Sequence, residues 1–278
     1  MSAKKNIRSC NIKSFKPVTL FFFICTCLQF IIPSAFGDRK VVIKTSKNKK
    51  TYVFTNHLKV KERGWHSSVF HGHLEGETSK KVVVKVPLID GFEQIKKEHK
   101  ILSRLSHPNI VRPIGLGTIV GDRLDAPALV MDLAPGEQFD LNFWKDKSLD
   151  EISDITKRIL HVLKYVENSG WSHRDVYGPN VHFDYHTNEI VLLDFGRAAE
   201  LEPSNKNEDL HGLGTMMLKV LSQKAQKQND REPPDDSIEE RHSSLKTILE
   251  LASSKDLDER YHRSDDMLEA LSAINFSE

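Results

Sequence analysis

One short polar string near the middle of the chain constrains it more than any other feature. Residues 173–180 read HRDVYGPN, and a DFG triplet begins at Asp194, fourteen residues after Asn180. In such a string a carboxylate can orient a hydroxyl, while an amide and a second carboxylate can hold Mg²⁺. Asp175 is the candidate for the first role, and Asn180 and Asp194 are the candidates for the second. A bare His-x-Asp would be a weak signal of such a site, but the full string with DFG at this distance is a strong one.

The segments upstream complete a known pattern. The strand 81–86 carries Lys85, Glu98 lies thirteen residues on in the helical run EHKILSRL, and HPNIVRPIGLG spans residues 107–117. With the polar string, these segments resemble the eukaryotic-type protein kinases of the serine/threonine kind over roughly residues 55–275. The resemblance implies an α+β, two-lobed fold, with a small β-rich N-lobe that holds one helix and a larger helical C-lobe.

The same resemblance implies how ATP would be held. Lys85 would contact the nucleotide phosphates and Glu98 would pair with Lys85, since lysine suits a phosphate as a compact point charge. Residues 129–133 read LVMDL, an apolar strand followed by the hinge. By position, Met131 would be the gatekeeper, and Asp132 and Leu133 would present backbone groups to the adenine edge.

Each match has an ordinary structural explanation when it is taken alone. Lys85 could be a strand-end lysine, Glu98 an exposed acid in an i,i+4 helix pair, and DFG a strand followed by a turn. The matches occur in the right order and at the right spacings, so they are not independent accidents.

The glycine-rich loop of the family is eroded. If Val69 is the usual valine of that loop, the three glycine positions fall on Glu62, Gly64 and Ser67, so only the middle glycine is present. Glycines let the backbone approach phosphates closely, so we expect nucleotide to be held less tightly. Gly64 and Val69 are the candidates for nucleotide contact here, although Gly64 could also serve a hairpin turn.

Tyr177 is a second departure from the family. Serine/threonine kinases usually carry a lysine at this position, and tyrosine kinases place an arginine or alanine nearby. A phenol cannot neutralise the charge of a transferring phosphate as an ammonium does. We therefore expect slow turnover or a substitute cation from elsewhere in the chain.

The activation segment is nearly missing. Only twelve residues separate Gly196 from Asp209, and no Ala-Pro-Glu motif is present. Asp209 matches the aspartate that ties down the catalytic-loop backbone in the family. Phosphorylation cannot order a loop that does not exist, so we expect constitutive activity or control by a protein activator.

Two arginines lose their usual partners through this truncation. In the family Arg174 pairs with a phosphate on the activation loop, and Arg260 resembles the arginine that pairs with the missing glutamate. A buried, unpaired guanidinium is costly. We expect Glu200 or Glu202 to form an ion pair with one of these arginines, or both arginines to be solvated.

The N-terminus has the layout of a secretory signal peptide. Residues 1–17 carry five basic side chains and no acid, residues 18–32 are almost entirely apolar, and Ala35 and Gly37 offer an A-x-G cleavage arrangement. The apolar run of fifteen residues is short of the roughly 20 that span a bilayer. We predict a signal peptide over 1–37 and a secreted protein, with an uncleaved membrane anchor as the alternative.

The loss of residues 1–37 changes the composition. All three cysteines leave with the leader, so the mature domain can form no disulfide. The chain without residues 1–37 has 35 basic side chains and 39 acidic ones, a net charge of −4. This charge gives no support for nucleic-acid binding. We expect a basic, loosely held lead-in over 38–54, the N-lobe over 55–132 and the C-lobe over 133–278.

The sequence therefore predicts a secreted or lumenal kinase that transfers the γ-phosphate of ATP, with Mg²⁺, to protein hydroxyls, with serine or threonine favoured by the resemblance. A pseudokinase that only binds a partner is one alternative, favoured by the eroded glycine loop and Tyr177. A small-molecule kinase of related fold, which often lacks an activation loop, is another. The sequence does not indicate the protein substrate, and it indicates membrane contact only for an uncleaved leader.

Overall fold

The computed structural model describes residues 39–44, 48–59, 67–88, 91–120, 126–204, 207–228 and 236–274. The predicted signal peptide and Gly64 lie outside these residues, so both assignments stay predictions. Within the described residues, no helix is both long and apolar enough to cross a membrane.

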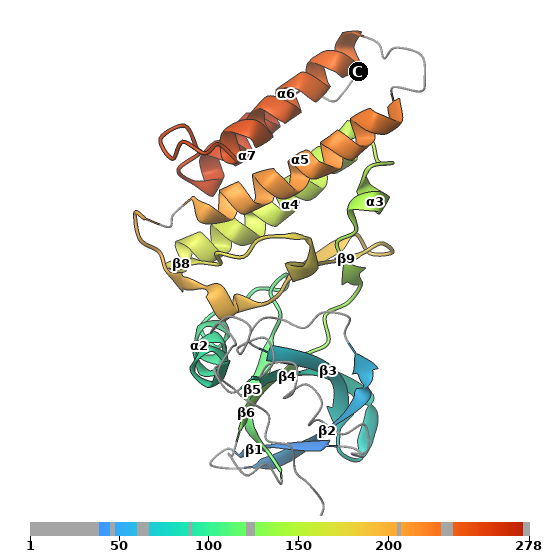
Figure 1. Cartoon of the computed structure of the whole chain (residues 1–278), viewed down its shortest axis with the longest axis vertical. Helices are drawn as coiled ribbons and strands as arrows, with labels where there is room; N and C mark the ends of the chain where they lie inside the picture. The colour runs from blue at the N-terminus through green and yellow to red at the C-terminus, as the bar shows by residue number, and fades with distance from the viewer. Residues whose placement is uncertain are drawn as a thin grey trace, which may run out of the picture. The chain divides into compact units, whose positions relative to one another are not determined.

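Six antiparallel strands of the first part close into a barrel in the order β1-β2-β3-β4-β6-β5 (Figure 1). Successive side chains of a strand point to opposite faces, so alternating apolar residues fill the barrel while polar residues face outward. The strands are β1 (Arg39–Lys44), β2 (Lys49–Lys59), β3 (Ser67–Leu74), β4 (Glu77–Pro87), β5 (Pro113–Ile119) and β6 (Pro127–Asp132).

The first strand, β1, closes the barrel by pairing with β2 on one side and β5 on the other. Val41, Tyr52 and Phe54 are almost fully buried in the barrel core. At Gly117 of β5 an added Cβ would lie 2.5 Å from Val41 Cγ1, so this close approach requires a glycine. The prediction of a loosely held lead-in over residues 38–54 is therefore wrong for the part that the structure describes.

The second part of the chain is mainly helical, and the mixed α+β class is confirmed. Helix α2 (Phe92–Leu102) packs against the barrel strands and against the turn η3 (Phe195–Arg197). Figure 1 shows α4 and α5 running side by side, as their contacts require. The remaining helices are α3 (Leu141–Trp144), α4 (Leu149–Asn168), α5 (Glu208–Gln228), α6 (Asp236–Ala252) and α7 (Ser264–Ser272).

Short strands and turns link the barrel to these helices. A three-stranded sheet joins β7 (Glu137–Gln138), β9 (Val181–Asp184) and β10 (Glu189–Leu192), and a second small sheet pairs β8 (Trp171–Ser172) with β11 (Ala199–Glu200). The turn η2 (Gly178–Asn180) lies between β8 and β9. The polar string of the sequence therefore runs from the end of β8 through η2, and the DFG triplet follows β10 after the single residue Leu193.

Helix α4 forms as its sequence predicts. Ser148 caps its N-terminus in a capping box with Glu151, in which each side chain accepts a hydrogen bond from the other residue's backbone N–H. Apolar residues at three- and four-residue spacing make one face of the helix. The buried residues of that face include Ile152, Ile155, Ile159, Leu163 and Val166. Because α4 ends next to β8, this packing fixes where the polar string begins.

The burial of β1 yields a direct test. Val41→Asp places a charge inside the barrel, so we expect a loss of at least about 3 kcal/mol in the free energy of unfolding. Val42 is the neighbouring, half-buried residue, and Val42→Asp should cost less than about 1 kcal/mol. Urea unfolding followed by circular dichroism measures both values. Equal losses for the two variants would show that β1 is not part of the core.

Candidate active site

Three charged side chains from distant parts of the sequence meet beside the barrel. Lys85 of β4 lies with its Nζ 2.8 Å from Glu98 Oε2 of α2 and 2.6 Å from Asp194 Oδ1. Lys85 and Glu98 are buried. Burial alone would lower the pKa of Lys85, but the two carboxylates outweigh this effect and raise it above its ordinary value. The lysine therefore stays charged.

Asp194 presents its carboxylate from a left-handed backbone, with φ of 57°. Such a conformation is uncommon for residues other than glycine and is concentrated at functional sites. Oδ1 accepts a hydrogen bond from the Gly196 N–H at 3.1 Å. Desolvation would raise the pKa of Asp194, but the ammonium of Lys85 and this N–H lower it below its usual value. The side chain is still 40% exposed, so the carboxylate is charged and accessible.

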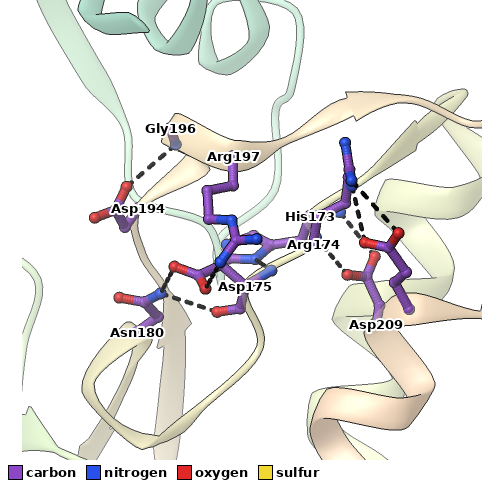
Figure 2. A network of polar contacts seen from close by, with 9 residues as sticks. His173, Arg174, Asp175, Asn180, Asp194, Gly196, Arg197 and Asp209 are labelled. Atoms are coloured by element: carbon purple, nitrogen blue, oxygen red, sulfur yellow. Dashed lines mark hydrogen bonds and ion pairs between the residues drawn. The ribbon is translucent and has the colours of Figure 1, made fainter. Parts of the chain in front are cut away.

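Asp175 and Asn180 lie next to each other on the loop that follows β8. The Asn180 amide nitrogen donates to both the backbone oxygen and Oδ2 of Asp175, each at 2.9 Å. Figure 2 shows the amide oxygen of Asn180 directed away from Asp175. An amide oxygen and a carboxylate suit Mg²⁺, which prefers oxygen ligands and keeps several waters. Asn180 and Asp194 therefore fit the predicted metal site.

A cavity of about 510 Å³ brings most of these groups together. Its lining includes Lys85, Glu98, Asp175 and Asp194, four of the residues that the sequence singled out. Ionisable groups of both signs in one partly enclosed cavity are typical of an active site.

Asp209, in the first turn of α5, anchors the loop that carries Asp175. Its buried carboxylate accepts hydrogen bonds from the backbone N–H of His173 at 2.7 Å and of Arg174 at 2.6 Å (Figure 2). It also accepts a hydrogen bond from Ser172 Oγ at 3.1 Å. Three donors on one carboxylate fix the backbone just before Asp175. The anchoring role that the sequence assigned to Asp209 is confirmed.

His173 connects this loop to the DFG turn. Its ring packs edge-on against Phe195 with centroids 4.6 Å apart, and its Nε2 lies 2.8 Å from the backbone oxygen of Leu193. Nε2 therefore carries the hydrogen, and Nδ1 accepts from the Asp175 N–H at 3.3 Å. The imidazole holds the polar string and the DFG turn at a fixed spacing.

Arg174 pairs with a carboxylate that the sequence analysis did not predict. Its Nε lies 2.8 Å from Glu208 Oε2, and Glu208 directly precedes the anchor Asp209. The half-buried Arg260 donates from Nε to the backbone oxygen of Ser254 at 2.6 Å. Both pairings depend on how the chain enters α5 and leaves α6, which residue spacing alone does not determine.

The predicted hinge lies where β6 ends. Met131 is buried and lies opposite Val83 of the adjacent strand β4, while Leu133 is 37% exposed. The N–H of Asp132 already donates to the backbone oxygen of Arg112, and its side chain pairs with the Arg112 guanidinium at 2.6 Å. Asp132 and Leu133 line a second cavity with Arg112 and are not among the described residues that line the cavity at Lys85, so their hinge role stays a prediction.

Val69 lies in β3 directly opposite Lys85 in the strand register. It is half-buried, and its contact with nucleotide stays a prediction.

One residue of the site was missed in the sequence analysis. Arg197 directly follows the DFG triplet, and its Nη1 lies 3.4 Å from Asp175 Oδ1 (Figure 2). Its side chain is 63% exposed and lines the same cavity. The only sequence signal was its position, because the direction of an exposed arginine depends on the fold.

Comparison with known proteins agrees with this geometry. Residues 63–217, more than half of the chain, match the family described as Protein kinase domain. The chain belongs to the protein kinase family. The matched region extends from just before β3 to the middle of α5, so it includes Lys85, Glu98 and the whole polar string.

Similar proteins come from plants and animals. The chain is 35% identical over 126 residues to "Mitogen-activated protein kinase kinase kinase 3" and 33% identical over 157 residues to "Serine/threonine-protein kinase 1", both of Arabidopsis thaliana. It is 33% identical over 143 residues to "Sperm motility kinase Z" of Mus musculus. These alignments cover 44%, 54% and 50% of this chain, but only 19%, 18% and 27% of the relatives.

The anchoring role of Asp209 can be tested by changing one atom. In Asp209→Asn one carboxylate oxygen becomes an NH₂ group that faces backbone N–H donors, so we expect a loss of about 2–4 kcal/mol in the free energy of unfolding. Asp265→Asn is the control, since Asp265 forms an exposed pair with Lys164 and should lose less than about 1 kcal/mol. Urea titrations of both variants measure the difference. Similar small losses would mean that Asp209 does not hold the loop.

Proposed function

We propose that this chain is an active protein kinase that transfers the γ-phosphate of ATP to hydroxyl groups of proteins, on serine or threonine. The observation that carries the proposal is the arrangement of Lys85, Glu98, Asp194 and Asp175 around one cavity, with Asn180 hydrogen-bonded to Asp175. Buried ion pairs are often no more stabilising than apolar packing. Stability therefore does not explain these charges, whereas nucleotide chemistry does.

Each group has a separate task in this reaction. Lys85 would bind the nucleotide phosphates, and Glu98 holds the lysine in place. Asn180 and Asp194 would hold Mg²⁺, which when bound neutralises phosphate charge. Asp175 orients the acceptor hydroxyl and receives its proton as the oxygen attacks the γ-phosphorus. The fixed loop backbone, anchored by Asp209, keeps the carboxylate of Asp175 in position for this step.

The contacts of Arg174 favour a kinase that needs no phosphorylation of its own activation segment. In kinases that are switched on by phosphorylation, new arginine–phosphate pairs order the loop. Here Glu208 already gives the Arg174 guanidinium a negative partner, and the Lys85–Glu98 pair is formed in the unmodified chain. We therefore propose constitutive activity, or control by a protein activator.

The acceptor class and the location are parts of the same proposal. The similar "Serine/threonine-protein kinase 1" of Arabidopsis thaliana supports serine or threonine as acceptor. A secretory leader over residues 1–37 would place the enzyme in the lumen or outside the cell, where it would need a source of ATP.

The test is phosphate transfer after removal of any existing phosphate. The purified protein is treated with phosphatase, repurified, and incubated with Mg²⁺, ATP labelled on the γ-phosphate and a general protein acceptor. We expect label on serine or threonine with the wild type, and at least about 100-fold less with Asp175→Asn or Asp194→Ala. Asp154→Asn, an exposed site on α4, should keep full activity.

Other outcomes would redirect the assignment. ATP binding without label on protein would contradict a protein kinase and favour a small-molecule acceptor. Absence of both binding and label would contradict catalysis and favour a pseudokinase.

A further inference from the structure

Two cations, Lys85 and Arg197, line the cavity among the residues that the structure describes there. They differ in how firmly they are held. Lys85 is buried between two carboxylates at 2.6 and 2.8 Å. Arg197 is 63% exposed and makes one longer contact, 3.4 Å to Asp175 Oδ1. An exposed ion pair of this kind is weak, so the guanidinium can leave Asp175 at little cost.

The backbone of Arg197 is nevertheless fixed. It closes the short turn η3, whose first residue, Phe195, is fully buried against His173. The side chain therefore starts from a rigid base and ends at the carboxylate that is proposed to receive the hydroxyl proton. Figure 2 shows the guanidinium of Arg197 above Asp175, between the anchored loop and the DFG turn.

The reaction needs positive charge at this place. Negative charge on the transferring phosphoryl group is stabilised by fixed cations, and this is a large share of catalysis in phosphoryl transfer. The neighbouring side chain of the loop is Tyr177, which lines the same cavity and is 44% exposed. A neutral phenol supplies no such charge, whereas a guanidinium is always charged and presents a planar fork that matches phosphate oxygens.

We propose that Arg197 contacts the γ-phosphate of bound nucleotide and is a catalytic residue of phosphoryl transfer. The proposal rests on the proposed function, because the same cavity must hold ATP. In the free protein the guanidinium pairs with Asp175, and with nucleotide bound it turns to the phosphate. Asp175 is then available to the acceptor hydroxyl. The bond between the hydroxyl oxygen and phosphorus forms, the bond to the ADP oxygen breaks, and the hydroxyl proton passes to Asp175.

The first test is binding, which needs no turnover. Affinities for ADP and for adenylyl imidodiphosphate, which carries a third phosphate and is not hydrolysed, are measured with Mg²⁺ for the wild type, Arg197→Gln and Arg197→Lys. We expect Arg197→Gln to weaken binding of the triphosphate analogue about tenfold and to leave ADP binding unchanged. The affinity of Arg197→Lys for the triphosphate analogue should lie between those of the wild type and Arg197→Gln, because lysine keeps the charge but not the planar fork.

The control is another exposed arginine with an acidic partner. Arg263 is 56% exposed and lies 3.5 Å from Glu167, and it is not among the residues that line the cavity. Arg263→Gln should leave both affinities unchanged. An analogue-to-ADP affinity ratio in Arg197→Gln equal to that of the wild type would overturn the inference.

Transfer rates separate this inference from the proposed function. We expect Arg197→Gln to lower kcat about 100-fold with little change in KM for the acceptor, and Tyr177→Lys in that background to restore part of the loss. A wild type that transfers no phosphate, but whose affinity ratio depends on Arg197, contradicts the proposed function and supports the contact. Equal transfer rates and equal ratios in wild type and Arg197→Gln overturn the contact and leave the proposed function in place.

Discussion

The rest of the site depends on the ion pairs of the Lys85 ammonium group. It is buried between Glu98 and Asp194, and these carboxylates come from the helix beside the barrel and from the turn after β10. Moving an ammonium group from water into the protein interior costs several kcal/mol, and the attraction of a single carboxylate seldom offsets that cost. Two carboxylates keep the lysine charged, so the barrel, α2 and the DFG turn must be assembled together.

A second set of contacts fixes the loop that carries Asp175. The Asp209 carboxylate accepts hydrogen bonds from the backbone of this loop. The His173 ring contacts Phe195 and the backbone oxygen of Leu193. These contacts are buried or partly buried, whereas the Arg197 side chain is mostly exposed. The site therefore combines rigid groups that define where nucleotide and hydroxyl would lie with one cation that can change partners.

Much of this arrangement could be predicted from the sequence, because it depends on residue type and spacing. Helix α4 followed from its apolar periodicity and its Ser148 cap, and the charged cluster followed from the resemblance to kinases. β1 was missed because its lysine-rich surroundings hid the inward alternation of Val41 and Ile43. Glu208 and Arg197 were missed because the choice of an ion-pair partner depends on the path of the chain in space.

The central claim is that this cavity binds nucleotide through Lys85, and one binding measurement tests it most directly. Calorimetric titration of Mg²⁺ and ATP is made on the wild type, Lys85→Met and Lys81→Met, with folding checked by circular dichroism. Lys81 is an exposed lysine of the same strand. We predict that Lys85→Met weakens binding at least about tenfold and that Lys81→Met binds like the wild type. Equal affinity of a folded Lys85→Met and the wild type would contradict the account.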